Sequence, residues 1–287
     1  MSHPLLTSAI ENAFVPLAVN NRPGTDGGLL ERYEEPQYNN PVVRYFAPGG
    51  EELLERRDRV WDSAETAERM VAALEAGDYE VPAYLQLARA ELSERLPERI
   101  VFAMSCFWEG QAALGGGEGV LVARPGFAEG REVVEVLYDA RTITAEALVR
   151  VAKQSKCTRR VFADGDALAD ARGIVGDVAR PLDGVEVRVA PASDDLVYLK
   201  RSPLSWLPLT PLQSLRVNAS LASPSAVDGA KPEDWLSPAQ RALLPRLRDV
   251  LSNDAARLEP LADQARGRRP QSLDELAAYR AALLELL

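Results

Sequence analysis

One short stretch, residues 101–109, places a buried strand directly before a helix. Its first residues form an uninterrupted apolar run, which favours a buried strand, and a helix-like segment begins at Trp108. Cys106 stands at the junction between the two elements. A cysteine at the start of a helix meets the positive end of the helix dipole, which favours its thiolate form. The stretch therefore predicts either a reactive thiol beside two aromatic rings or a structural cysteine buried among them.

Side chains that commonly carry catalysis are scarce in this chain, and this limits its chemistry. Cys106 and Cys157 are the only cysteines, and His3 is the only histidine, among 287 residues. A catalytic triad, a Cys–His pair and a histidine-ligated zinc site each need an interior histidine. Two cysteines are also too few for a cysteine-rich metal site. We therefore expect no metal and no bound cofactor, and chemistry based on thiol, carboxylate, Tyr, Lys or Arg.

Charge and hydropathy argue against several kinds of partner. The formal net charge of -10 argues against nucleic acid or an anionic membrane surface, because both require a basic footprint. We find no apolar run long enough to span a membrane and expect no signal peptide. A chain with 2 cysteines is not a disulfide scaffold, so we expect a reducing, cytoplasmic environment.

Breaks in the hydropathy pattern predict the domain organisation. We expect a first domain over residues 1–80, a linker helix over 81–97, a second domain over 98–200 and a helical extension over 201–287. In the second domain, strands and helices alternate, and the turns between them permit antiparallel pairing. This pattern predicts an α+β fold with helices on one face of a sheet.

The element boundaries follow from periodicity, caps and turn residues. Ser63, Thr144 and Thr210 are predicted helix N-caps, and Pro125-Gly126 is a predicted turn. The predicted strands are 14–19, 42–46, 99–105, 120–124, 132–138, 160–162 and 185–189. The main predicted helices are 64–75, 84–96, 108–114, 145–154, 166–173, 212–221, 238–251 and 276–287.

The order of the elements predicted for the first domain matches part of a known fold. The order is helix, strand, helix, a loop with Asn40-Pro41, strand, turn, strand and helix, which resembles the second half of a thioredoxin-like domain. Residues 14–26 and 35–44 are similar to a thioredoxin-like family whose redox motif is Val-Pro-Gly-selenocysteine. The resemblance implies a cis bond before Pro41, where the alternative is a trans proline opening an edge strand. It also implies a missing first half, and we expect an upstream selenocysteine codon that was read as a stop.

The second domain carries a series of segments in a specific order: Ser105-Cys106-Phe107-Trp108, then 119–130, 132–139 and 143–148. Over about residues 98–160 they resemble the A-type peptide methionine-sulfoxide reductases. That family has a Gly-Cys-Phe-Trp motif at a strand end, a Gly-Tyr-x-Gly-Gly segment, a His-Ala-Glu-Val-Val strand and a Tyr-Asp-Pro turn before a helix. The resemblance implies a ferredoxin-like plait and reduction of methionine-S-sulfoxide.

The resemblance also implies roles for individual residues. Cys106 would attack the sulfoxide sulfur, and Cys157 would resolve the resulting sulfenic acid as a disulfide. Glu132 or Glu109 would protonate the departing oxygen. The alternatives are a solvated face position for Glu132 and an inert buried thiol for Cys157. The physiological reductant would be thioredoxin or another dithiol, and the substrate would be oxidised methionine, free or in proteins.

The substrate-binding residues implied by the resemblance are Phe107, Trp108 and Phe127, which would hold the methyl and thioether end. The sequence also departs from the family. Ser105 replaces a Gly, Phe127 replaces a sulfoxide-binding Tyr, and the loop that carries the family's acid is deleted between Gly130 and Glu132. Two further functions therefore stay open: a thiol-disulfide protein without sulfoxide reductase activity, and a non-catalytic interaction module.

Overall fold

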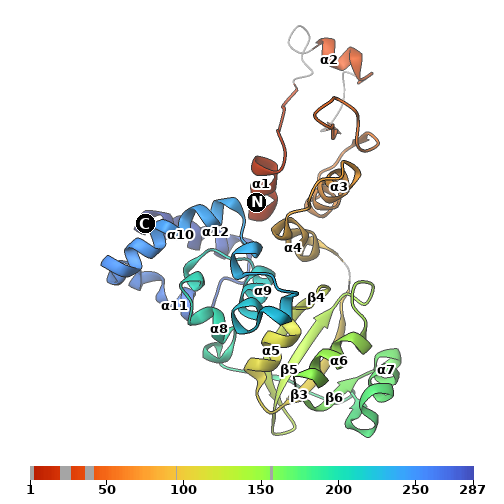
Figure 1. The fold of residues 1–287 in the computed structure, drawn as a ribbon, viewed down its shortest axis with the longest axis vertical. Helices are drawn as coiled ribbons and strands as arrows, with labels where there is room; N and C mark the ends of the chain where they lie inside the picture. The colour runs from red at the N-terminus through yellow and green to blue at the C-terminus, as the bar shows by residue number, and fades with distance from the viewer. Residues whose placement is uncertain (1–2, 20–26, 36–41, 95, 156–157) are drawn as a thin grey trace. The chain divides into compact units, whose positions relative to one another are not determined.

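The computed structural model describes residues 3–19, 27–35, 42–94, 96–155 and 158–287. The chain divides into two compact units, residues 2–94 and residues 95–287. The protein is a mixed α/β protein, and its larger sheet lies in the second unit (Figure 1).

The described part of the N-terminal unit contains helices and a two-stranded antiparallel sheet. Helix α4 packs against α1 and α3, so the helix predicted as a linker belongs to this unit. Near its C-terminal end, the Glu91 carboxylate accepts a 3.1 Å hydrogen bond from His3 Nε2. The elements are α1 Pro4–Asn12, α2 Gly27–Arg32, β1 Val42–Val43, β2 Arg57–Asp58, α3 Ser63–Ala76 and α4 Ala83–Leu92.

Local predictions in this unit need correction at two places. Residues 14–19 form no strand, and Val15 and Leu17 are exposed, because alternating apolar residues make a strand only where another strand pairs with them. The N-cap of α3 is Asp62, whose carboxylate accepts the 3.0 Å hydrogen bond from Ala64 N, and Ser63 is already the first helical residue. The Asn40-Pro41 bond lies outside the described residues.

The C-terminal unit contains a six-stranded sheet with the strand order β7-β6-β3-β5-β4-β8. Neighbouring strands are antiparallel, except that β6 and β7 run parallel. This mixed sheet agrees with the prediction of an α+β fold. The elements are β3 Glu98–Met104, α5 Phe107–Gly115, β4 Val120–Ala128, β5 Arg131–Tyr138, α6 Ala145–Gln154, β6 Thr158–Ala163, α7 Gly165–Val175, β7 Ala179–Pro181 and β8 Arg188–Val189.

Strand β4 is longer than its sequence predicts. Pro125-Gly126 is not a turn but continues the strand, and the chain reverses at Glu129-Gly130, where both residues have positive φ. Gly126 is required because a Cβ there would lie 2.9 Å from the Arg188 carbonyl oxygen of β8. The glycine therefore marks a close approach between strands rather than a reversal of the chain.

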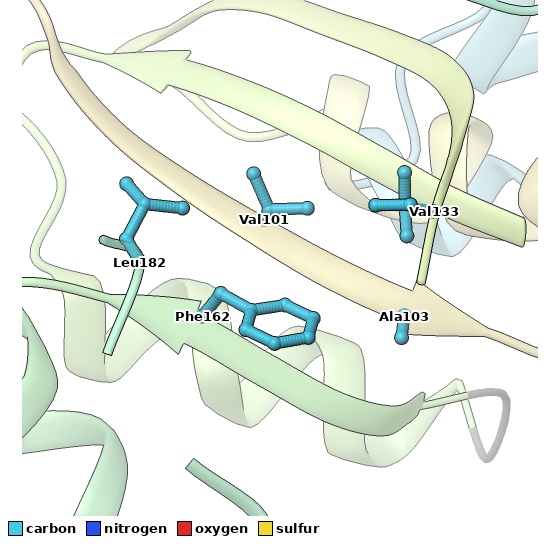
Figure 2. Packing of buried hydrophobic residues seen from close by; sticks show 6 residues of the cluster. Val101, Ala103, Val133, Phe162 and Leu182 are labelled. Carbon is cyan, nitrogen blue, oxygen red and sulfur yellow. The ribbon is translucent and has the colours of Figure 1, made fainter. Parts of the chain in front are cut away.

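Both faces of the central strands are buried. On one face, Met104 and Val134 lie against α5, since a Cβ on Gly110 of that helix would meet both side chains. The opposite face carries a cluster of apolar residues, and Figure 2 shows several of its side chains projecting from one side of the sheet. The cluster consists of Val101, Ala103, Ala128, Val133, Phe162 and Leu182, with Val185 and Val187 packed against it.

The helices of the last third of the chain belong to the same compact unit as the six-stranded sheet. Helix α9 packs against α5 and begins with the predicted capping box of Thr210 and Gln213. Its Arg216 is buried and donates hydrogen bonds to the carbonyl oxygens of Gly115 and Val120. The helices are α8 Val197–Lys200, α9 Pro211–Ala222, α10 Pro238–Asn253, α11 Ala262–Arg266 and α12 Leu273–Leu286. None of the described helices is long and apolar enough to cross a membrane.

The packing around the end of α5 gives a stability prediction. A Cβ on Gly116 would overlap the carbonyl oxygen of Ala226, whereas a Cβ on Gly173 of α7 would meet nothing within 4 Å. We expect Gly116→Ala to lower the free energy of unfolding by about 1–3 kcal/mol through overpacking. We expect Gly173→Ala to raise it by up to about 1 kcal/mol through helix propensity. Urea unfolding measures both changes, and equal effects would contradict this account.

Tyr279 of α12 gives a prediction at alkaline pH. Its hydroxyl donates a 2.8 Å hydrogen bond to the Trp206 carbonyl oxygen, and burial raises the pKa of Tyr279 from 10.0 to about 12, against the opposing charge of Arg269. The folded state therefore holds the phenolic proton more tightly than the unfolded chain does. This stabilisation is complete below pH 10 and is lost as the pH rises through 12.

We accordingly expect Tyr279→Phe to lose less unfolding free energy between pH 10 and pH 12 than the unchanged protein loses. The matched control is Tyr79→Phe, because Tyr79 is exposed. Chemical denaturation at a series of pH values measures the slopes. If the Tyr279 variant retains the full slope, the buried phenol is not its source.

Candidate functional site

Cys106 lies where strand β3 ends and helix α5 begins, as the sequence predicts. It is the N-cap residue of α5, with extended backbone angles of φ -150° and ψ 109°, and its side chain makes no capping hydrogen bond. The residue is partly buried and is a free thiol in the described part of the chain. As the N-cap residue, Cys106 directly precedes the backbone N–H groups of the first helical turn. Cys157 lies outside the described residues.

Glu132 lies at the same end of α5. Its Oε2 accepts a 2.9 Å hydrogen bond from the backbone N–H of Phe107, the residue after Cys106. In the sheet, Glu132 is paired with Phe127, and its neighbour Val133 belongs to the cluster on the opposite face. Strand alternation therefore turns Glu132 toward α5, where its carboxylate satisfies a helix N-terminal donor. The structure thus brings Glu132 to the start of the helix that carries Cys106.

Three aromatic side chains meet beside this helix end. The Phe107 and Phe127 rings lie 5.5 Å apart in an edge-on arrangement, and the Phe107 and Trp108 rings lie 6.2 Å apart. Phe107 is buried, whereas Trp108 and Phe127 are partly exposed. The predicted substrate-binding residues therefore divide into two kinds. Phe107 supports the other two rings from within, and Trp108 and Phe127 offer apolar surface.

Two arginines that the sequence did not single out lie on these rings. The guanidinium carbon of Arg188 lies 4.7 Å from the Phe127 ring centre, and that of Arg201 lies 5.7 Å from the Trp108 ring centre. Both are cation–π distances. Arg188 is positioned by the pairing of β8 with β4, and Arg201 follows α8. The sequence around Arg188 and Arg201 does not indicate these contacts, because each one joins chain segments that are distant in sequence.

Glu109 and the Trp108 indole differ in their exposure to solvent. Glu109, the alternative acid, is exposed in the first turn of α5. Trp108 Nε1 is buried and makes no hydrogen bond within the described residues. No group of three or more metal-ligating side chains occurs in the described parts of the chain. What the site offers is a thiol and a carboxylate at one helix end, flanked by aromatic rings and guanidinium groups.

Comparisons with models of known protein families and with curated proteins gave no match for this chain.

The hydrogen bond between Glu132 and Phe107 N gives a prediction for the stability of the site. We expect Glu132→Ala to lower the free energy of unfolding by about 1 kcal/mol, because it leaves a helix N-terminal donor without its acceptor. Glu132→Gln keeps an acceptor oxygen and should lose less. The matched control is Glu186→Ala at an exposed position, expected within about 0.5 kcal/mol of the unchanged protein. Equal losses for the two alanine variants in urea unfolding would contradict the capping role.

Proposed function

We propose that this protein is a divergent thiol enzyme of the A-type methionine-sulfoxide reductase kind, which reduces methionine-S-sulfoxide to methionine. The observation that carries the proposal is the Glu132 carboxylate on the backbone N–H next to Cys106. It brings an acid and a nucleophile to one helix end, which is the combination that sulfoxide reduction requires.

The topology supports a ferredoxin-like plait for this domain. Strands and helices follow one another as β3-α5-β4-β5-α6-β6, which is the β-α-β-β-α-β pattern of that fold. In the sheet these strands lie in the order β6-β3-β5-β4. Two separate βαβ-type halves are thereby interleaved, and the helix after the first strand, α5, carries Cys106 at its start.

The proposed reaction transfers the sulfoxide oxygen to Cys106 and then regenerates the thiol. The Cys106 thiolate attacks the sulfoxide sulfur and forms a sulfur–sulfur bond, while Glu132 protonates the sulfoxide oxygen and the S–O bond breaks. The oxygen, released as water, then attacks the Cys106 sulfur, a proton returns to Glu132, and the sulfur–sulfur bond breaks with its electron pair going to the departing methionine. The cysteine is oxidised to a sulfenic acid and the substrate sulfur is reduced. A second thiol then displaces water to form a disulfide, and an external dithiol reduces this disulfide by exchange.

The surrounding side chains have supporting roles. Trp108 and Phe127 would contact the methyl and thioether carbons, with Phe107 fixing both rings from the core. Because Phe127 has no hydroxyl, stabilisation of the sulfoxide oxygen falls to Glu132 and to the N–H groups at the start of α5.

The proposed reaction also needs a second thiol in the protein and an external reductant. Cys157 is the proposed resolving residue, since it is the only other cysteine of the chain. Residues 2–94 contain no cysteine, so the N-terminal unit as given supplies no dithiol. We therefore propose thioredoxin or another external dithiol as the reductant, in a reducing compartment such as the cytoplasm.

One observation favours a second candidate function. The Glu132 oxygen is already engaged by Phe107 N, and a carboxylate held as an acceptor serves a structural role. A thiol-disulfide exchange protein needs no proton donor toward a sulfoxide oxygen. On this alternative Cys106 would exchange with disulfides, and the site would turn over no sulfoxide.

Turnover of the separated S and R isomers of methionine sulfoxide, with dithiothreitol as reductant, tests the proposal. We expect reduction of the S isomer, none with Cys106→Ser, and a loss of about 10²-fold in kcat with Glu132→Gln. The control Glu186→Gln should match the unchanged protein. No turnover of either isomer would contradict the reductase proposal, and disulfide exchange by Cys106 under the same conditions would then favour the alternative.

The role of Cys157 has its own test. We expect Cys157→Ser to release one methionine per protein molecule without added thiol, but to lose turnover supported by thioredoxin. Mass spectrometry should find a Cys106–Cys157 disulfide in the unchanged protein after reaction and a sulfenic acid on Cys106 in the variant. A sulfenic acid that persists in the unchanged protein would remove Cys157 from the mechanism.

A further inference from the structure

A cleft in the C-terminal unit shares no lining residue with the Cys106 site. It has a volume of about 390 Å³, within the range of small-molecule sites. Strand β4 and the segment after β8 form part of its wall, and the turn between α11 and α12 forms the rest. Its lining consists of Arg124, Pro125, Val189, Ala190, Ala192, Asp195, Gly267, Arg268, Arg269 and Gln271.

Arg269 is the unusual residue of this lining, because its side chain is only 6% exposed. Its Nη1 donates a 2.6 Å hydrogen bond to the Ser205 carbonyl oxygen, and its Nη2 donates a 3.1 Å bond to that of Leu207. Its Nε is buried and has no hydrogen-bond partner in the described part of the chain. Within that part no carboxylate forms an ion pair with it, and Asp195 acts on it only through its electrostatic field.

A buried guanidinium without a counterion is costly, since its hydration is lost and no opposite charge replaces it. Burial lowers the pKa of Arg269 to about 10, so the group stays charged at neutral pH. Three backbone carbonyls, those of Ser205, Leu207 and Ala265, satisfy some of its donors but do not neutralise its charge. The positive charge of Arg269 is therefore not balanced by a carboxylate ion pair within the described residues.

The other charges of the cleft increase this imbalance. Arg124 and Arg268 are exposed, and their ion pairs with Glu135 and Glu275 span 3.8 and 3.9 Å, at the weak end of ion-pair contacts. Among the described residues of the lining, Asp195 is the only acid, and its Oδ1 already accepts a 2.6 Å hydrogen bond from Gln111 Nε2.

Lys200 adds another positive group behind the wall of the cleft. Its ammonium donates to the carbonyl oxygen of Ala192, which is a lining residue. Burial, followed by the charge of Arg269, lowers the pKa of Lys200 against the opposing effect of Asp195 and Asp194. Positive charge thus collects around this cleft in a chain whose net charge is -10.

We propose that this cleft binds a small molecule through a phosphate or carboxylate group. Arg269 would supply the buried positive charge, and Arg124 and Arg268 would contact the oxygens from the two walls. Guanidinium groups suit this role, because their planar fork of N–H donors matches the geometry of both oxyanions. The inference uses no residue of the Cys106 site and does not depend on sulfoxide reduction.

Isothermal titration of the full chain with inorganic phosphate, and separately with citrate, tests the proposal at constant ionic strength in chloride buffer. We expect saturable binding of at least one of the two, together with an increase in melting temperature. Arg124→Gln combined with Arg268→Gln should weaken the binding by about tenfold or more, because charge-assisted hydrogen bonds are lost. Both residues are exposed, so this variant should fold.

The matched control is Arg172→Gln, which removes an exposed positive charge from α7 outside the cleft. It should bind as the unchanged protein does. Phosphate binding without citrate binding would assign a phosphoryl ligand, and the reverse a carboxylate ligand. Absence of saturable binding of both probes would overturn the proposal, as would an equal loss of affinity in the control variant.

Discussion

The close packing of α9 against α5 is the contact on which the arrangement of the C-terminal unit depends. At Gly115 the two helices approach so closely that a Cβ would collide with Leu215. The neighbouring Arg216 buries its guanidinium there and donates to carbonyl oxygens of Gly115 and Val120. The carbonyls at a helix C-terminus carry partial negative charge, so a cation is favourable at this position. One residue therefore holds the end of α5, the start of β4 and the last third of the chain together.

Gln111 likewise fixes the middle of α5 against other segments of the unit. Its side-chain amide donates to the Ala123 carbonyl oxygen at 2.9 Å and to Asp195, and its oxygen accepts from Leu196 N at 2.9 Å. A buried amide with all these partners fixes one arrangement, since any displacement leaves polar groups unsatisfied. Because α5 is held along its length, the positions of Cys106 and of the Phe107 N–H at its start are held as well.

Much of this fold could be predicted from the sequence, because many boundaries depend on local chemistry. Thr144 and Thr210 cap their helices as their side chains suggest, and β3 and β5 lie within one residue of their predicted limits. Pro125-Gly126 was misread because a glycine that admits a neighbouring strand has the same local pattern as a turn. The sequence does not distinguish a solvated face position for Glu132 from a functional one, because an alternating strand is compatible with both, and the contact with Phe107 N depends on how α5 packs on the sheet.

The non-local part of the candidate site could not be predicted. Arg188 and Arg201 reach the aromatic rings only through strand pairing and helix packing, and the cleft around Arg269 combines segments that are distant in the chain. Charged residues at such positions look like ordinary surface residues in the sequence. Cys106, by contrast, was found because strand, thiol and helix are consecutive, so that one short segment contains the whole arrangement.

The ends of the six-stranded sheet have a further consequence. One edge is β7, only 3 residues long and ending in Pro181, which has no N–H to donate, and the other is the 2-residue β8. Such edges offer few free backbone groups to a strand from another molecule. Pairing of a second chain with β7 or β8 would therefore gain few backbone hydrogen bonds, and β3, the long buried strand, lies away from both edges.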